Sequence, residues 1–237
     1  MEIIDAKNID FQDLNKIIKE KTEVEIINCD GQRFIGSGTI DKKIVVKGVP
    51  GNALGAYMSG STVSVFGNAQ DAVGDTMNDG KIIVHGNCGD AVGYAMRGGK
   101  IFIKGKAGYR VGIHIKEYKD KKPVIIIGEN AGSFLGEYQA GGLIVVLNLK
   151  GEEAVGDFCG TGMHGGKIFL RTDNPPKDLP KQVNLFKATK TDLEEIKDYL
   201  DEYCQDFGLK LSDVILGTFY VLTPNSANPY KQLYVRN

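Results

Sequence analysis

The stretch GNAQDAVGDTMNDGKIIVHGNCGDAVGYAMRGGKIFIKG, residues 67–105, contains nearly the same pattern twice. Seven of its positions return after an interval of 19 residues. They are Gly67, Asp71, Val73, Gly74, Met77, Gly80 and Ile82, which recur as Gly86, Asp90, Val92, Gly93, Met96, Gly99 and Ile101. A fixed period of this length is the signature of a repeat architecture, so it takes precedence over any single motif in deciding the fold.

The period extends well beyond this stretch. An apolar residue followed by glycine recurs seven times from Ile35-Gly36 to Val155-Gly156, at intervals of 19, 19, 19, 19, 24 and 20 residues. Short runs such as IIV at 82–84 and IFI at 101–103 are bounded by glycine, which is typical of strands. Nineteen residues are too few for a strand–helix–strand unit, which needs about 30. The repeat predicts an all-β fold, a right-handed parallel β-helix of about seven turns.

The high glycine content, 31 of 237 residues, fits this architecture. A bend repeated in every turn needs positive φ or a close backbone approach, and glycine allows both. Asn148 replaces glycine in the column that begins at Gly48, and asparagine also tolerates the left-handed region. Two other columns have predicted roles. Met58, Met77 and Met96 should point inward, and Asn52, Asp71 and Asp90 should close bends through side-chain hydrogen bonds to the backbone.

The regions flanking the repeat divide the chain into three parts: a helical cap at 1–30, the β-helix at 31–172, and a C-terminal helix with an aromatic tail at 173–237. A helix is predicted at 10–19 behind an Asp10 cap. A second helix should start at a capping box, Thr191 to Glu194, and stop at Gly208. An open stack exposes strand edges at both ends, so both helical elements are predicted to cover them.

Composition excludes several classes of function. The formal net charge of −1 and a pI near 6.3 give no electrostatic basis for binding nucleic acid or an anionic membrane. The acidic N-terminal residues lack the pattern of a signal peptide, and the longest apolar runs are shorter than a membrane-spanning helix requires. A cytoplasmic protein is therefore expected. The four scattered cysteines form no CxxC pair and should be reduced and buried.

No catalytic, cofactor-binding or metal-ligating residues are predicted in this chain. Residues 160–165 read as GxGxxG, but a dinucleotide fingerprint must open a helix, whereas the strand-like KIFL follows here. Three histidines lack the spacing of a metal site. The fifth repeat carries an insert from His114 to Pro123, and inserts in repeat proteins often form contact surfaces. A solvated charged loop is one reading of this insert. The other is a partner-docking loop that involves Arg110, His114, Lys116 and His164.

Residues 36–170 resemble the GXGXG-repeat family, found as the C-terminal domain of the glutamate synthase large subunit and as one of the subunits of formylmethanofuran dehydrogenase. Within that family the chain looks most like the stand-alone third-domain subunit of archaeal-type split glutamate synthases. The segments that carry this closer resemblance are Gly48–Gly55, Tyr109–His114, Gly136–Gly142, Gly160–Gly166 and, in the tail, Asn228–Tyr234.

The resemblance implies a scaffold role in glutamate biosynthesis and nitrogen metabolism. In glutamate synthases a glutaminase domain hydrolyses glutamine, and a separate domain with FMN and an iron–sulfur cluster forms glutamate. The expected partners are therefore a glutaminase and an FMN-binding synthase subunit, which would carry those cofactors. Two alternatives stay open: a β-helix subunit of another redox complex such as formylmethanofuran dehydrogenase, and a free-standing β-helix enzyme acting on polysaccharide.

Overall fold

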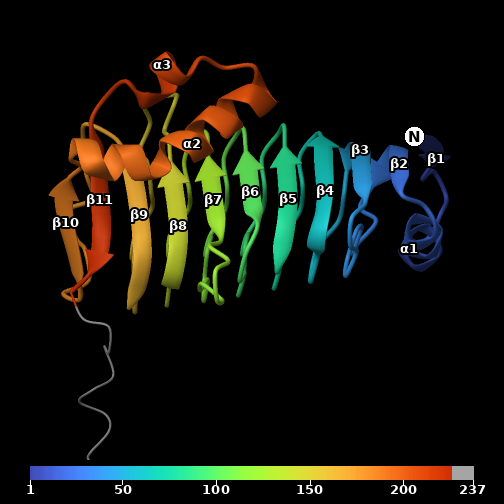
Figure 1. The fold of residues 1–237 in the computed structure, drawn as a ribbon, viewed down its shortest axis with the longest axis horizontal. Coiled ribbons are helices and arrows are strands. Elements are labelled where there is room, and N and C mark those ends of the chain that lie inside the picture. The colour runs from blue at the N-terminus through green and yellow to red at the C-terminus, as the bar shows by residue number, and fades with distance from the viewer. Residues whose placement is uncertain (226–237) are drawn as a thin grey trace, which may run out of the picture.

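The computed structural model describes residues 1–225, which form a single sheet of eleven strands in the order β1-β2-β3-β4-β5-β6-β7-β8-β9-β11-β10 (Figure 1). The strands are β1 (Glu2–Asp5), β2 (Glu23–Asp30), β3 (Lys43–Val49), β4 (Ser59–Phe66), β5 (Asp79–Val84), β6 (Lys100–Ile103), β7 (Val124–Ile127), β8 (Ala140–Val146), β9 (Gly165–Arg171), β10 (Val183–Lys187) and β11 (Phe219–Pro224). The helices are α1 (Phe11–Glu20), α2 (Lys190–Phe207) and α3 (Leu211–Ile215).

Consecutive strands from β1 to β9 pair in parallel, which confirms the predicted β-helix. One column shows the register. Ile82 pairs with Ile101, Ile101 with Ile125, Ile125 with Ile144 and Ile144 with Ile168, and all five side chains are fully buried. Residues that occupy the same place in successive turns therefore stack into continuous apolar columns inside the coil.

The stack begins one turn earlier than the repeat indicates. Parallel strands β2 to β9 give eight rungs, and β1 pairs in parallel with β2 beyond them. Residues 1–30 thus contain two strands of the sheet in addition to the predicted helix. The repeat pattern does not reveal this turn because α1 stands between β1 and β2, where later turns have a glycine bend.

Each bend contains three residues with left-handed φ, at every second position, whereas the sequence indicated only one such residue, the glycine. In one turn these are Ala91, Gly93 and Ala95, with φ of 57°, 68° and 49°. The middle position is glycine in seven turns: Gly36, Gly55, Gly74, Gly93, Gly112, Gly136 and Gly160. A Cβ atom on Gly93 would lie 2.5 Å from Cδ1 of Ile125, so this position must be free of a side chain as well as left-handed.

The predicted side-chain columns are present, with one difference. Met58, Met77 and Met96 are fully buried, and Asn148 has the left-handed φ of 44°. The Asp column does not close its own bends but joins consecutive turns. Oδ1 of Asp71 accepts the backbone N–H of Asp90 at 2.9 Å, 19 residues further on. Each carboxylate therefore satisfies a donor in the next rung.

The first helix covers the N-terminal end of the stack, as predicted. Asp10 caps α1 by accepting hydrogen bonds from the backbone N–H groups of Gln12 and Asp13. Leu14 and Ile18 of α1 are fully buried against the interior of the coil. At the other end β11 pairs antiparallel with β9, and β10 follows it at the edge. The first part of the aromatic tail is therefore a strand of the sheet, while Asn228–Tyr234 lies outside the described residues.

The prediction that the second helix covers an open end is wrong. Figure 1 shows α2 lying across the sheet, and its apolar residues pack on the outward side chains of β5 to β9. Ile83, Phe102 and Phe169 form part of that outward layer. The predicted start of α2 is also two residues late: Thr189 and Asp192 form the capping box. The predicted stop at Gly208 is confirmed by its left-handed φ of 66°.

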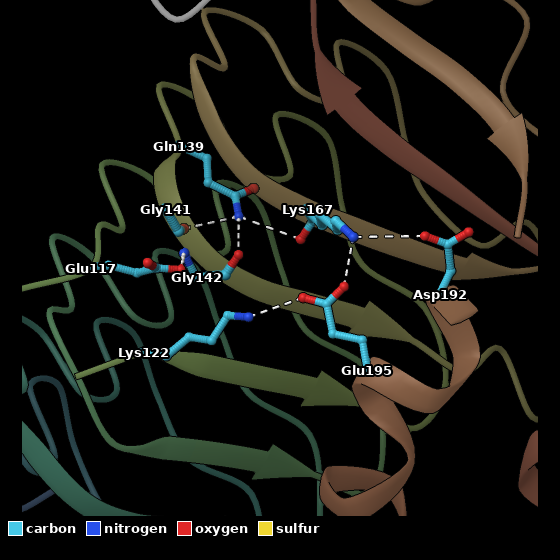
Figure 2. A network of polar contacts seen from close by, with 8 residues as sticks. All are labelled: Glu117, Lys122, Gln139, Gly141, Gly142, Lys167, Asp192 and Glu195. Atoms are coloured by element: carbon cyan, nitrogen blue, oxygen red, sulfur yellow. Dashed lines mark hydrogen bonds and ion pairs between the residues drawn. The ribbon is translucent and has the colours of Figure 1, made fainter. Parts of the chain in front are cut away.

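Lysines of the sheet and of the insert at 114–123 hold one edge of α2 through carboxylates (Figure 2). Nζ of Lys167 lies 2.6 Å from Glu195, which also pairs with Lys122 at 3.0 Å. Burial raises the pKa of Glu195, but the hydrogen bonds from Lys167 and Lys122 outweigh this and hold the pKa below its usual value. Further along the helix, Glu202 pairs with Lys81 at 2.8 Å. The helix is thus fixed by an apolar stripe and by partly buried ion pairs.

His85 is a structural residue at the end of this interface. Its ring stacks on Phe66 at 4.3 Å between centroids and meets Phe207 of α2 edge-on at 5.2 Å. Burial lowers the pKa of His85, the positive charge of Lys104 lowers it further, and Asp206 acts in the opposite sense. The neutral imidazole is therefore the form that fits between the two phenylalanine rings.

The bend geometry yields a first prediction. Gly93→Ala adds a Cβ atom in a left-handed residue and against Ile125, so we expect a loss of about 3 kcal/mol of stability. Gly151→Ala is the matched control, because Gly151 has φ of 70° but no atom within 4 Å of the added carbon. It should lose only about 1 kcal/mol. Urea unfolding of both variants measures this difference, and equal losses would contradict the packing argument.

A second prediction concerns pH. Because the pKa of His85 is lowered in the folded state, its neutral form is present in both states above about pH 6.5. Below that pH the unfolded chain gains the proton first, so stability falls as pH decreases through the folded-state pKa. We expect the thermal midpoint to drop between pH 7.5 and 5.5, and to drop less in His85→Phe. Parallel pH profiles for the two proteins would show that His85 is not the cause.

Candidate docking surface

The left-handed bends carry a row of aromatic rings that are exposed or half-buried. His114 stacks on Tyr138 with 5.1 Å between ring centroids and 8° between planes, and Tyr94 meets His114 edge-on at 6.0 Å. The three residues belong to consecutive turns. His114 and Tyr138 occupy the last left-handed position of their bends, with φ of 56° and 53°, and Tyr94 stands beside that position.

A second row runs beside the first along the other side of the glycine column. Phe134 and Phe158 stack at 4.9 Å between centroids, and the guanidinium of Arg110 lies 4.7 Å from the centre of the Phe134 ring. Nε of Arg110 is also 3.1 Å from a carboxylate oxygen of Glu137. We call the two rows together the ring patch, which consists of Tyr94, Arg110, His114, Phe134, Tyr138 and Phe158.

The ring patch arises because the side chains at equivalent bend positions change along the stack. In the second, third and fourth repeats the first left-handed position is alanine, at Ala53, Ala72 and Ala91. In later turns the same position holds Arg110, Phe134 and Phe158, listed in chain order. A large side chain in the left-handed region is strained, and such strain concentrates at functional sites. Large rings also occur at the start of the stack, where Phe34 holds the first left-handed position of the first bend and Tyr57 the last of the second. In the third and fourth bends the outer positions hold only alanine and threonine, and large side chains return from the fifth bend onward.

The structure brings the four residues predicted for docking onto this surface. Arg110 and His114 belong to the ring patch, and Lys116 follows His114 on the same turn. His164 lies two turns further on, where its Nδ1 is 3.0 Å from the carbonyl oxygen of Gly162. A Cβ atom on Gly162 would lie 2.4 Å from the Tyr138 ring, so the turn at Gly162 lies against that ring. His164 follows two residues later in the chain.

Sequence reasoning did not identify the aromatic members of the patch. Tyr94, Phe134, Tyr138 and Phe158 each lie one or two residues from the glycine of their bend. That spacing could have predicted the patch, because residues at the same distance from a repeated glycine should project from the same side of the stack. The 24-residue interval after Val111 concealed it, since the insert breaks the simple count of 19.

Much of the insert is bound to neighbouring turns. The carboxylate of Glu117 accepts the backbone N–H of Gly142 at 3.1 Å, as Figure 2 shows. Nζ of Lys121 lies 2.8 Å from Asp79, and Lys122 pairs with Glu195 of α2. Lys116, Tyr118 and Lys119 are exposed. The insert is therefore anchored at its end and open to solvent at its start.

Other side chains that could carry chemistry are enclosed. Cys29, Cys88, Cys159 and Cys204 are buried and unpaired. Burial raises the pKa of Cys29 to about 11 and that of Cys159 to about 12, so both thiols stay protonated at neutral pH. In residues 1–225 no cluster of three or more His, Cys, Asp or Glu side chains is placed to hold a metal ion. Nor does any helix in that range have the length and apolar character to cross a membrane.

Comparison with known proteins identifies the family. The GXGXG motif family matches residues 6–228, nearly the whole chain. The chain belongs to the GXGXG motif family. This is the type of domain found at the C-terminus of glutamate synthase, as the sequence resemblance indicated.

Two similar proteins extend this comparison. The uncharacterized protein MJ1350 of Methanocaldococcus jannaschii is 44% identical, and the match covers 98% of this chain and 95% of the relative. A chain of the formyltransferase/hydrolase complex (FhcABCD) of Methylorubrum extorquens, solved with methylofuran, has a TM-score of 0.64 at 19% identity. That match covers 92% of this chain and 88% of the solved chain. At this identity it shows that the fold is shared.

The exposure of the rings yields a third prediction. Phe158 is 56% exposed, whereas Phe169 is fully buried beneath α2. Phe158→Ala should cost about 1 kcal/mol or less, since it removes one ring stack from the surface. Phe169→Ala should cost about 3 to 5 kcal/mol, because it leaves a cavity. Chemical unfolding compares the two, and a large loss for Phe158→Ala would mean that the ring patch serves the fold.

Proposed function

We propose that this protein is a non-catalytic scaffold subunit of a cytoplasmic glutamate synthase, in which it holds catalytic subunits together. The partners are a glutaminase subunit and an FMN-binding synthase subunit with an iron–sulfur cluster. Together they form glutamate from 2-oxoglutarate and glutamine or ammonia. This chain contributes no cofactor and no reacting group to the proposed complex.

The ring patch is the observation that carries the scaffold proposal. Tyrosine, other aromatic residues and arginine are enriched where protein interfaces derive most of their binding energy. Tyr94 is 41% exposed and Phe158 56% exposed, so both rings are available to a partner. The rings are held by stacking and by the bend backbone, so little conformational entropy is lost when a partner covers them. Membership of the GXGXG motif family supports glutamate synthase as the specific complex.

A second candidate is a β-helix subunit of a formyltransferase/hydrolase type of complex. The structural match over 92% of this chain favours it, because the similar chain belongs to a multi-subunit complex. Both candidates predict a docking role and differ in the partners. The choice between them therefore rests on the identity of the bound subunits.

The test is purification of the tagged full-length chain from its native cells, with identification of the bound subunits and a visible spectrum. We expect a flavin and iron–sulfur spectrum, glutaminase and synthase subunits, and glutamate formation from 2-oxoglutarate. Formyltransferase and hydrolase subunits would support the second candidate instead. A colourless chain that elutes alone at low salt would contradict both.

A variant pair links that result to the ring patch. Tyr138→Ala with Phe158→Ala should leave the circular dichroism spectrum unchanged and reduce recovery of the partners by at least about tenfold. Leu216→Ala is the control, because Leu216 is 71% exposed and belongs to the segment after α3. Equal recovery with the double variant and the control would place the interface on another surface.

A further inference from the structure

Cations line one border of the ring patch. Arg97, Lys116, Ala140 and His164 occupy the same position in four successive turns, two residues after the last left-handed residue of each bend. Their backbones are stacked: the N–H of Lys116 donates to the carbonyl of Met96 at 3.0 Å, and the N–H of His164 donates to that of Gln139 at 2.8 Å. Successive residues in such a column lie about 4.8 Å apart. We call Arg97, Lys116 and the neighbouring Lys119 the cationic edge.

The cationic edge differs from the lysines beside α2 in having no carboxylate partner, and from other unpaired lysines in following the bends that carry the ring patch. Lysines of the sheet beside α2 are neutralised by carboxylates, as Lys81 is by Glu202 and Asp206. Arg110, inside the ring patch, is paired with Glu137. Arg97, Lys116 and Lys119 are exposed and form no ion pair within residues 1–225, as is also true of lysines far from the ring patch such as Lys43 and Lys187.

Acidic groups near the cationic edge do not neutralise it. The carboxylate of Glu117 is directed to the backbone N–H of Gly142, and Asp120 is exposed further along the insert. The histidines at 114 and 164 border the same edge. Three cations without a carboxylate partner thus adjoin an apolar ring surface, in a chain whose formal net charge is −1.

We propose that a carboxylate-rich surface of a partner subunit docks along the cationic edge, while apolar groups of that partner pack on the adjacent ring patch. This inference rests on the proposed scaffold function and specifies the chemistry of the partner. Complementary charge at the border of an interface speeds association and fixes orientation, whereas buried rings supply affinity. The cationic edge beside two rows of rings provides both parts.

The experiment measures association between the purified full-length chain and the catalytic subunit that co-purifies with it, at 50 and 300 mM NaCl. The test variant is Arg97→Glu with Lys116→Glu. We expect its association rate at 50 mM NaCl to fall by about tenfold or more, with a weaker salt dependence than the wild-type rate. Arg97→Lys with Lys116→Arg should restore the wild-type rate, because it keeps both charges.

A control with the same change in net charge is Lys43→Glu with Lys187→Glu, on the exposed sides of β3 and β10. Its association rate should stay within about twofold of the wild-type rate, since Lys43 and Lys187 belong to other turns of the stack than Arg97 and Lys116. A polyglutamate peptide should compete with the partner, and an uncharged peptide should not.

The outcomes separate this inference from the scaffold function. If the wild type binds its partner and both charge-reversed variants bind equally fast, the acidic docking surface is wrong and the scaffold function stands. If the wild type binds no catalytic subunit, the scaffold function fails and this inference fails with it. Unchanged circular dichroism spectra for the variants confirm that exposed residues were altered without loss of the fold.

Discussion

The whole stack depends on a left-handed bend whose central residue has no side chain. In six of the turns that glycine lies under an isoleucine of a nearby strand, as Gly93 lies under Ile125. The contact brings successive turns close enough for their strands to pair in parallel and for inward side chains to form columns. A larger residue would have to displace the isoleucine and adopt a strained φ at the same time. Conformation and packing therefore select glycine together.

The same bend explains how the surface can vary while the core repeats. The outer left-handed positions of the bends accept side chains of very different size. Ala72 and Phe158 occupy equivalent positions with φ of 58° and 61°. The backbone is thus a fixed frame that presents different side chains in different turns. On this surface the later turns present stacked rings, at a cost in local strain that the rest of the stack supports.

One face of the coil is covered by α2, and the bend face is not. On the sheet side, α2 covers the apolar outward residues of β5 to β9 and is held by lysine–carboxylate pairs such as Lys167 with Glu195. That surface is closed by the chain itself. On the bend side the ring patch stays exposed or half-buried, and the cations of the cationic edge stay unpaired within the described residues. The bend side therefore presents both an apolar surface and positive charges of this chain.

The sequence alone determined the features that depend on local spacing. A period of 19 set the register of the strands and placed Met77 inside, and helix-capping patterns put Asp10 and Gly208 at the ends of helices. Such features follow from neighbours in the chain or from strict repetition, so one sequence is enough to reveal them. The family resemblance rests on the same repetition, since its motif consists of the glycines that the bends require.

Only the tertiary structure decided where non-repeating segments pack. The sequence indicated a capping box at Thr191, and in the folded chain Thr189 and Asp192 form it instead. The place of α2 depends on the apolar outward layer of five strands, which exists only after the stack has formed. The ring patch likewise joins Tyr94 to residues as distant as Phe158. Contacts between remote segments depend on surfaces that no local spacing encodes, and for that reason the sequence did not reveal them.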